Sequence, residues 1–315
     1  MPIRIPLLLF LTIGSAFAQT QTLATISPIP RPRENLSPRA DFTTDTQLVI
    51  VPATVTDRRG AVVTGLAADS FIVSQDNSPQ RIVSFGEEDT PVALGVVLDT
   101  SGSMQHVLEN AKSTLQAFFR SANPEDEACL YTVSSTPTKN SEFTPDFNTL
   151  LARTMFLNSG GSTALVDSIY SAIELTRKSR LPRKAILVIS DGMDNHSRYS
   201  KSELSALAME SDMQIYSITV YDPPRNKKPI ELAEERNGLA FLQDLSRRTG
   251  GVQLVVHDPA EFDRAAADIG RAMRDQYLIG YAPDANATDA KWHAIKVRLN
   301  LPGVSVSARP GFYAR

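Results

Sequence analysis

The chain has 315 residues, of which 42% are hydrophobic and 21% charged, and its formal net charge is −3. This composition is typical of a globular protein of about two domains, and it excludes disordered, collagen-like and disulfide-scaffold classes. The small negative charge gives no general attraction to nucleic acid, so we expect no nucleic-acid partner. The single cysteine, Cys129, cannot form an internal disulfide, and no Cys/His grouping has the spacing of a zinc site.

The first residues have the pattern of a secretory signal. Arg4 supplies a positive start, residues 7–13 are apolar, and small residues precede a predicted cleavage between Ala18 and Gln19. The apolar run is far shorter than the roughly 20 residues that span a bilayer, and no later segment is long enough. We therefore expect a signal peptide over residues 1–18, no membrane span, and an exported protein that is periplasmic or secreted.

The mature chain begins with a proline-rich stretch over residues 19–40, which predicts an extended linker. Residues 41–88 follow as an N-terminal β segment, because runs rich in Val, Ile and Thr alternate with turn residues. The strands predicted in this segment are 47–56, 61–64, 71–74 and 80–85.

Residues 90–275 change to alternating strand and helix patterns. The first strand, 92–98, is continuously apolar, which is typical of a strand buried on both faces. This alternation predicts an α/β domain with a doubly wound, mainly parallel sheet. The remaining predicted strands are 128–133, 185–189, 214–220 and 252–256, and the predicted helices lie around 107–119, 164–173, 239–248 and 260–274.

Residues 276–315 return to a β pattern, with strands predicted over 276–282, 292–300 and 304–309. The simplest arrangement pairs these with the N-terminal strands in one flanking β domain, with the α/β domain inserted between the two halves. His293 shares a strand face with apolar residues, so we interpret it as a packing residue and not a ligand.

Two strands of the α/β segment end in acids, Asp99 and Asp191. Ligands of open α/β sheets bind at the carboxyl ends of strands. Ser101 and Ser103 follow the first acid in a tight turn, and Thr163 lies in a glycine-containing loop between the two acids in sequence. Together these five side chains offer oxygen donors of the kind that hard cations such as Mg²⁺ prefer.

In this order the pieces resemble the von Willebrand factor type A domain and its metal-ion-dependent adhesion site. The motifs are Asp-x-Ser-x-Ser at Asp99, Gly-Gly-Ser-Thr ending at Thr163, and Ser-Asp-Gly at Asp191. The resemblance implies that Ser101, Ser103 and Thr163 approach the cation directly or through water. It implies that the two acids bind mainly through water and orient the hydroxyls.

The flanking β segments extend the likeness to exported bacterial proteins of the von Willebrand factor type A-related kind, carried by residues 277–281 and 309–313. The resemblance implies adhesion or protein–protein interaction, in which a carboxylate of a partner protein completes the shell of the metal. It implies that the chain is not an enzyme. Mg²⁺ is the expected cofactor, although oxygen ligands also accept Mn²⁺ or Ca²⁺.

Other interpretations stay open at this point. Asp99 and Ser103 could cap a helix, Thr163 could start one, and Asp191 could belong to a plain turn. Two further functions are a structural scaffold with an unused metal site and a metal-dependent hydrolase. The hydrolase is disfavoured because the chain has no Gly-x-Ser-x-Gly elbow and its Gly-Gly-Ser-Thr loop has no Walker lysine.

Overall fold

The computed structural model describes residues 48–87, 89–221, 229–283 and 290–314. The predicted signal peptide 1–18, its cleavage site between Ala18 and Gln19, and the predicted linker 19–40 lie outside the described residues. Within them, no helix combines the length and the apolar character needed to cross a membrane.

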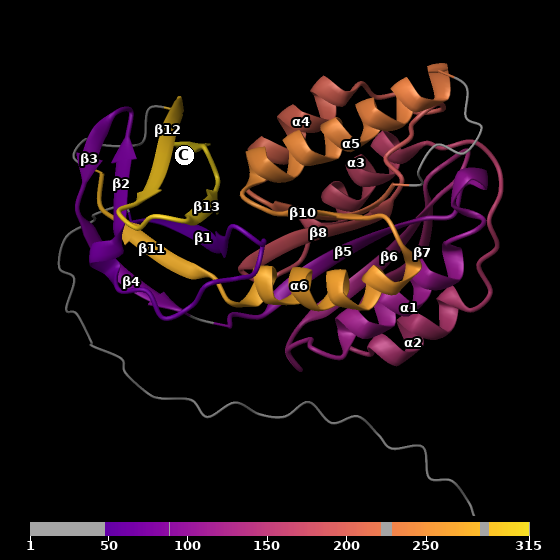
Figure 1. Ribbon diagram of the computed structural model, residues 1–315, viewed down its shortest axis with the longest axis horizontal. Coiled ribbons are helices and arrows are strands. Elements are labelled where there is room, and N and C mark those ends of the chain that lie inside the picture. The colour runs from indigo at the N-terminus through magenta and orange to yellow at the C-terminus, as the bar shows by residue number, and fades with distance from the viewer. Residues whose placement is uncertain (1–47, 88, 222–228, 284–289, 315) are drawn as a thin grey trace, which may run out of the picture.

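A six-stranded sheet is the centre of the α/β part, with strand order β10-β9-β8-β5-β6-β7 (Figure 1). Neighbouring strands are parallel except for β7, which runs antiparallel to β6. This order confirms the predicted doubly wound, mainly parallel sheet. The strands are β5 (Val92–Asp99), β6 (Glu127–Val133), β7 (Thr138–Thr144), β8 (Arg183–Ser190), β9 (Gln214–Val220) and β10 (Gln253–Val256).

Helices cover both faces of this sheet because its central strand is apolar on both. Val96 and Leu98 of β5 pack into one hydrophobic core, whereas Val97 packs into the other. The first face is covered by α1 (Leu108–Phe119), α2 (Phe147–Thr154) and α6 (Phe262–Arg274), and the second by α3 (Leu165–Thr176), α4 (Lys201–Glu210) and α5 (Pro229–Thr249).

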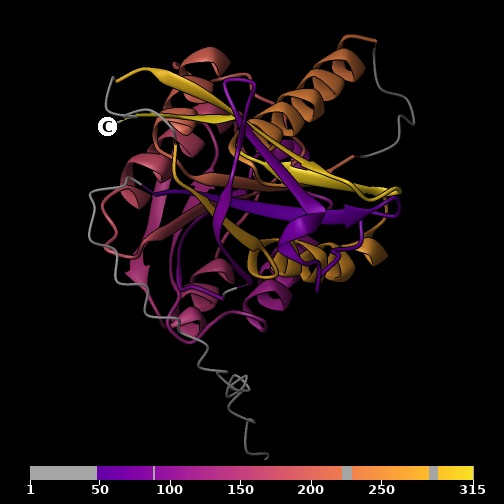
Figure 2. The ribbon, with the colours of Figure 1, turned by 90° about the vertical axis from the view of Figure 1, so that its left-hand side faces the viewer.

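Two antiparallel sheets form the flanking β part, with strand orders β13-β1-β11-β4 and β14-β12-β2-β3. N-terminal strands pair with C-terminal strands in both sheets, since β11 lies between β1 and β4 and β12 pairs with β2. Figure 2 shows these indigo and yellow strands side by side. The predicted pairing of the two ends is confirmed. The strands are β1 (Val49–Asp57), β2 (Phe71–Gln75), β3 (Ser78–Gln80), β4 (Ile82–Glu87), β11 (Tyr277–Tyr281), β12 (Trp292–Leu299), β13 (Val304–Ala308) and β14 (Gly311–Tyr313).

Some predicted elements differ from the structure. Residues 61–64 do not resume a strand, because only Val62 forms an isolated bridge, to Thr56. The sequence patterns also missed β7, α2, α4 and β14, and they assigned most of β3 to a turn. His293 is half-buried in the β part, where Nδ1 lies 2.8 Å from Asp76 Oδ2 and the ring stacks on Phe312. Three single-turn 3₁₀ helices complete the described elements, at Ala68–Ser70, Gly102–Met104 and Pro259–Glu261.

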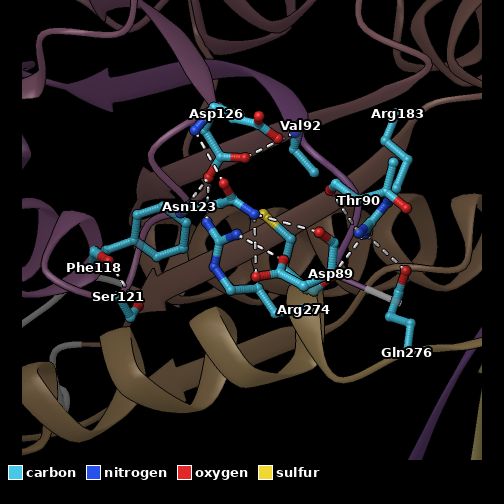
Figure 3. A network of polar contacts seen from close by, with 12 residues as sticks. Asp89, Thr90, Val92, Phe118, Ser121, Asn123, Asp126, Arg183, Arg274 and Gln276 are labelled. Carbon is cyan, nitrogen blue, oxygen red and sulfur yellow. Dashed lines mark hydrogen bonds and ion pairs between the residues drawn. The ribbon is translucent and has the colours of Figure 1, made fainter. Parts of the chain in front are cut away.

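A buried polar network joins the two parts where the chain crosses between them (Figure 3). Arg274, at the end of α6, lies 3.1 Å from Asp89 in the first crossing and also forms an ion pair with buried Asp126. Arg183 donates to the side chain of Gln276 in the second crossing at 2.9 Å.

Gln276 extends this network into the sheet that contains β1 and the sheet that contains β9. Its amide nitrogen lies 2.9 Å from the Thr54 hydroxyl on β1 and 2.9 Å from the Tyr216 hydroxyl on β9. The network lies at the amino ends of the parallel strands. The carboxyl ends therefore form the edge of the molecule opposite the β part, as Figure 1 shows.

The network predicts a large loss of stability for Arg274→Ala. The substitution leaves the carboxylate of Asp126 buried without its cation, which costs about 3–5 kcal/mol of unfolding free energy. Chemical denaturation measures this value. Arg271→Ala is the matched control on the same helix, because Arg271 forms an exposed pair with Asp268, and exposed pairs contribute about 0–1 kcal/mol. Equal losses in the two variants would contradict the role assigned to Arg274.

Candidate metal site

The two acids predicted from sequence lie at the ends of neighbouring strands. Asp99 is the last residue of β5, and Asp191 directly follows β8, which pairs with β5 in parallel register. After β5 the chain moves to β6 on one side, and it later returns to β8 on the other side. This is the topological switch point, where open α/β sheets bind ligands.

The turn after β5 holds two of the predicted hydroxyl ligands close together. Asp99 Oδ1 accepts a hydrogen bond from the backbone N–H of Ser101 at 2.9 Å. The hydroxyls of Ser101 and Ser103 are 3.1 Å apart. Ser101 is buried and Ser103 is exposed, so this pair of oxygens leads from the interior of the turn to solvent.

Backbone hydrogen bonds attach the third loop to this turn. Gly160 N donates to Thr100 O at 2.8 Å, and Gly102 N donates to Gly161 O at 3.2 Å. Gly161 has a φ of +80°, a conformation that favours glycine. These contacts place Thr163, two residues further on, beside the turn that carries Asp99.

Asn195 fixes the backbone of Thr163 from the loop after β8. The side-chain oxygen of Asn195 accepts from Thr163 N at 2.9 Å, and the backbone nitrogens of Asn195 and His196 both donate to Thr163 O at 3.0 Å. The structure thus brings the loops of all five predicted ligands to one edge. Sequence reasoning could assign Asn195 a part in loop shape, but not this partner.

Ser190 is a further residue of the site that the sequence motifs did not assign. Its hydroxyl donates to Asp99 Oδ2 at 2.5 Å and accepts from Gly192 N at 2.9 Å. Ser190 is fully buried at the end of β8, directly after the apolar run 185–189. The sequence did contain a signal for this residue: a polar side chain directly after an apolar run and directly before a motif acid.

The electrostatics of the site favour a cation. Asp99 is fully buried, Asp191 is 8% exposed, and neither forms an ion pair with any residue that the structure describes. Burial, followed by the negative charge of Asp191, raises the pKa of Asp99 to about 7. Two carboxylates without a countercharge, beside three hydroxyls, are a donor set that fits a hard cation.

The donor set depends on hydroxyls as well as acids. Over the described ranges, no group of three or more His, Cys, Asp or Glu side chains is arranged to hold a metal ion. A site at this edge therefore has only two charged donors, Asp99 and Asp191, and needs the hydroxyls of Ser101, Ser103 and Thr163.

Residues 94–193 match the sequence model of the von Willebrand factor type A domain, and all five predicted ligands fall in this range. The match indicates similarity to a von Willebrand factor type A domain over this part of the chain. No curated protein matches the chain.

Three solved bacterial structures are similar in fold. BatB from Bacteroides thetaiotaomicron is 18% identical with a TM-score of 0.45, over 58% of this chain and 98% of that one. The vWF domain of the type V pili tip protein Mfa5 from Porphyromonas gingivalis is 14% identical with a TM-score of 0.47, over 59% and 95%. A von Willebrand factor type A protein from Catenulispora acidiphila is 10% identical with a TM-score of 0.49, over 87% and 75%.

The unbalanced charges predict that Asp191→Asn stabilises the metal-free protein. The amide keeps the oxygen that accepts from Met193 N, and it removes the charge that opposes ionised Asp99. In a chelating buffer above neutral pH we expect a gain on the order of 1 kcal/mol in unfolding free energy. Chemical denaturation measures it, and a variant less stable than the parent would show that the two carboxylates do not oppose each other.

Proposed function

We propose that the type A domain binds a divalent cation, Mg²⁺, at the carboxyl edge of its sheet and through it the carboxylate of a partner protein. The observation that carries the proposal is the buried carboxylate of Asp99 beside Asp191, without a countercharge and next to the hydroxyls of Ser101 and Ser103. Mn²⁺ or Ca²⁺ could replace Mg²⁺ with the same oxygen ligands.

In this proposal the hydroxyls of Ser101, Ser103 and Thr163 contact the ion, and the carboxylates of Asp99 and Asp191 hold it mainly through water. A bound cation supplies the positive charge that this edge otherwise lacks, so a partner carboxylate can approach. Ser190 and Asn195 would orient the residues around the ion, which is the task of groups behind metal ligands.

We propose a binding role and not catalysis. A serine nucleophile needs an adjacent base to remove its proton. In the described structure, the Ser101 hydroxyl contacts Ser103 Oγ at 3.1 Å and the carboxylate of Asp99, which this proposal assigns to the cation and not to a base. Adhesion or protein–protein interaction outside the cytoplasm also agrees with the signal peptide proposed for residues 1–18. A structural scaffold whose metal site is unused is the alternative that the first experiment addresses.

Mg²⁺ is expected to stabilise the protein through this site. A ligand that binds only the folded state adds RT ln(1 + [L]/Kd), about 2.7 kcal/mol at a hundredfold excess over Kd. We expect thermal unfolding of residues 19–315 to shift upward in millimolar Mg²⁺, and Asp99→Asn to abolish the shift. Asp194→Asn is the matched control, because Asp194 lies outside the predicted ligands and its amide can still accept from Ser197 N.

The possible outcomes of this experiment distinguish a binding site for a partner protein from a structural scaffold. A shift that Asp99→Asn abolishes and Asp194→Asn retains supports the site and justifies a search for Mg²⁺-dependent partners. A shift of the same size in all three proteins would contradict the site. Binding of Mg²⁺ without any carboxylate-bearing partner would favour the scaffold.

The bonds to Thr163 predict that Asn195→Ala weakens Mg²⁺ binding without removing a ligand. The variant leaves the Thr163 N–H without its acceptor, so the loop no longer holds the hydroxyl in place. Groups behind metal ligands typically contribute about 10–100-fold to affinity. Calorimetric titration with Mg²⁺ measures the change. Asn148→Ala, at an exposed position on α2, is the control, and equal affinities of the two variants would show that Asn195 has no positioning role.

A further inference from the structure

The turn after α2 exposes two large apolar side chains. Met155 is 76% exposed and Phe156 is 83% exposed. Among the other large hydrophobic residues of the described structure, the most exposed is Tyr313, at 48%. Single exposed apolar residues are ordinary on protein surfaces, whereas two adjacent and strongly exposed ones form a small apolar patch.

The core does not need these two side chains. The apolar residues of α2 that pack inward are Leu150, which is fully buried, and Phe147, whose ring stacks on Phe119 at 4.5 Å. The helix ends at Thr154, so Met155 and Phe156 fall outside the helical spacing that would turn them toward the sheet.

Hydrogen bonds hold this turn in one conformation. Leu157 N donates to Thr154 O at 3.1 Å, and the Thr154 hydroxyl donates to Leu151 O at 2.7 Å. Lys112 of α1 donates to Leu157 O at 2.9 Å and also pairs with Glu109 at 2.8 Å. A turn whose backbone is already fixed loses little backbone entropy when a partner covers it.

The pair lies close to the candidate metal site. Phe156 precedes Gly160 by four residues, so their Cα atoms are at most about 14 Å apart. The backbone N–H of Gly160 donates a hydrogen bond to the carbonyl oxygen of Thr100, which lies between Asp99 and Ser101 in sequence. The exposed pair therefore belongs to the same edge of the molecule as the candidate metal ligands.

We propose that Met155 and Phe156 are a second contact point for the partner whose carboxylate binds at the metal. This inference rests on the proposed function and adds the chemistry of the partner: a protein segment with an apolar side chain within about four residues of its acid. The metal selects the acid, and the apolar pair selects among acidic segments. Aromatic and methionine side chains are enriched at such interfaces.

The test uses synthetic peptides with one fixed glutamate and one leucine moved stepwise along the neighbouring positions, the others being Gly and Ser. We expect binding in millimolar Mg²⁺ that is lost in chelator and when the glutamate is replaced by glutamine. It should be strongest for leucine within about four residues of the acid. The double variant M155S/F156S should bind the best peptide at least about tenfold more weakly.

Two controls keep the outcomes distinct. Val83→Ser removes an exposed apolar side chain from β4, in the β part, and should bind the peptides as the parent does. The Mg²⁺ shift in thermal unfolding should be the same in M155S/F156S as in the parent, because neither residue is a ligand.

Each of the other possible results contradicts one named part of the proposal. Mg²⁺-dependent binding that is equal in M155S/F156S, or indifferent to the place of the leucine, overturns the second contact point and leaves the metal site intact. No Mg²⁺ shift in the parent overturns the proposed function itself. A Mg²⁺ shift without capture of any acidic peptide contradicts a carboxylate partner and the contact point with it. Mg²⁺-dependent self-association lost in M155S/F156S would identify a second copy as occupant in place of a separate partner.

Discussion

The pairing of β5 with β8 is the constraint on which the candidate site depends. Their parallel register brings Asp99 and Asp191 to the same edge, and the sheet buries the first of them completely. Burying a carboxylate beside another carboxylate is unfavourable unless a countercharge is present. A neutral residue in place of either acid would remove this cost in free energy, and binding of a cation would offset it.

The rest of the edge is organised around this pair by backbone hydrogen bonds. Gly160 and Gly161 attach the central loop to the turn after β5, and Asn195 attaches Thr163 to the loop after β8. The backbone of each loop that carries these hydroxyls is therefore held by contacts that do not depend on the ion. Such preorganisation lowers the cost of gathering neutral donors around a cation, which is needed where only two donors carry charge.

The sequence was sufficient for the features that depend on strong local patterns. Continuous apolar runs identified β5 and β8, and motif acids and hydroxyls at strand ends identified five residues that the structure brings to one edge. The missed elements have weak patterns. β7 is a largely polar edge strand, and α2 and α4 are short helices whose clearest signals are caps, at Asp146 and at Ser200 with Glu203. Long-range partners such as Asn195 with Thr163 require the fold itself.

The topology also gives the β part a mechanical relation to the candidate site. β5 follows the first crossing from the β part and ends at Asp99, so one strand connects the two ends of the molecule. β5 is paired along its length with β6 and β8. A pull on the metal edge would act parallel to these strands, so many of their hydrogen bonds would bear the load in shear at the same time. At its amino end, the network of Arg274 and Arg183 holds both crossings. A pull at the metal edge would therefore be resisted by a strand that is buried along its whole length and not by a loop.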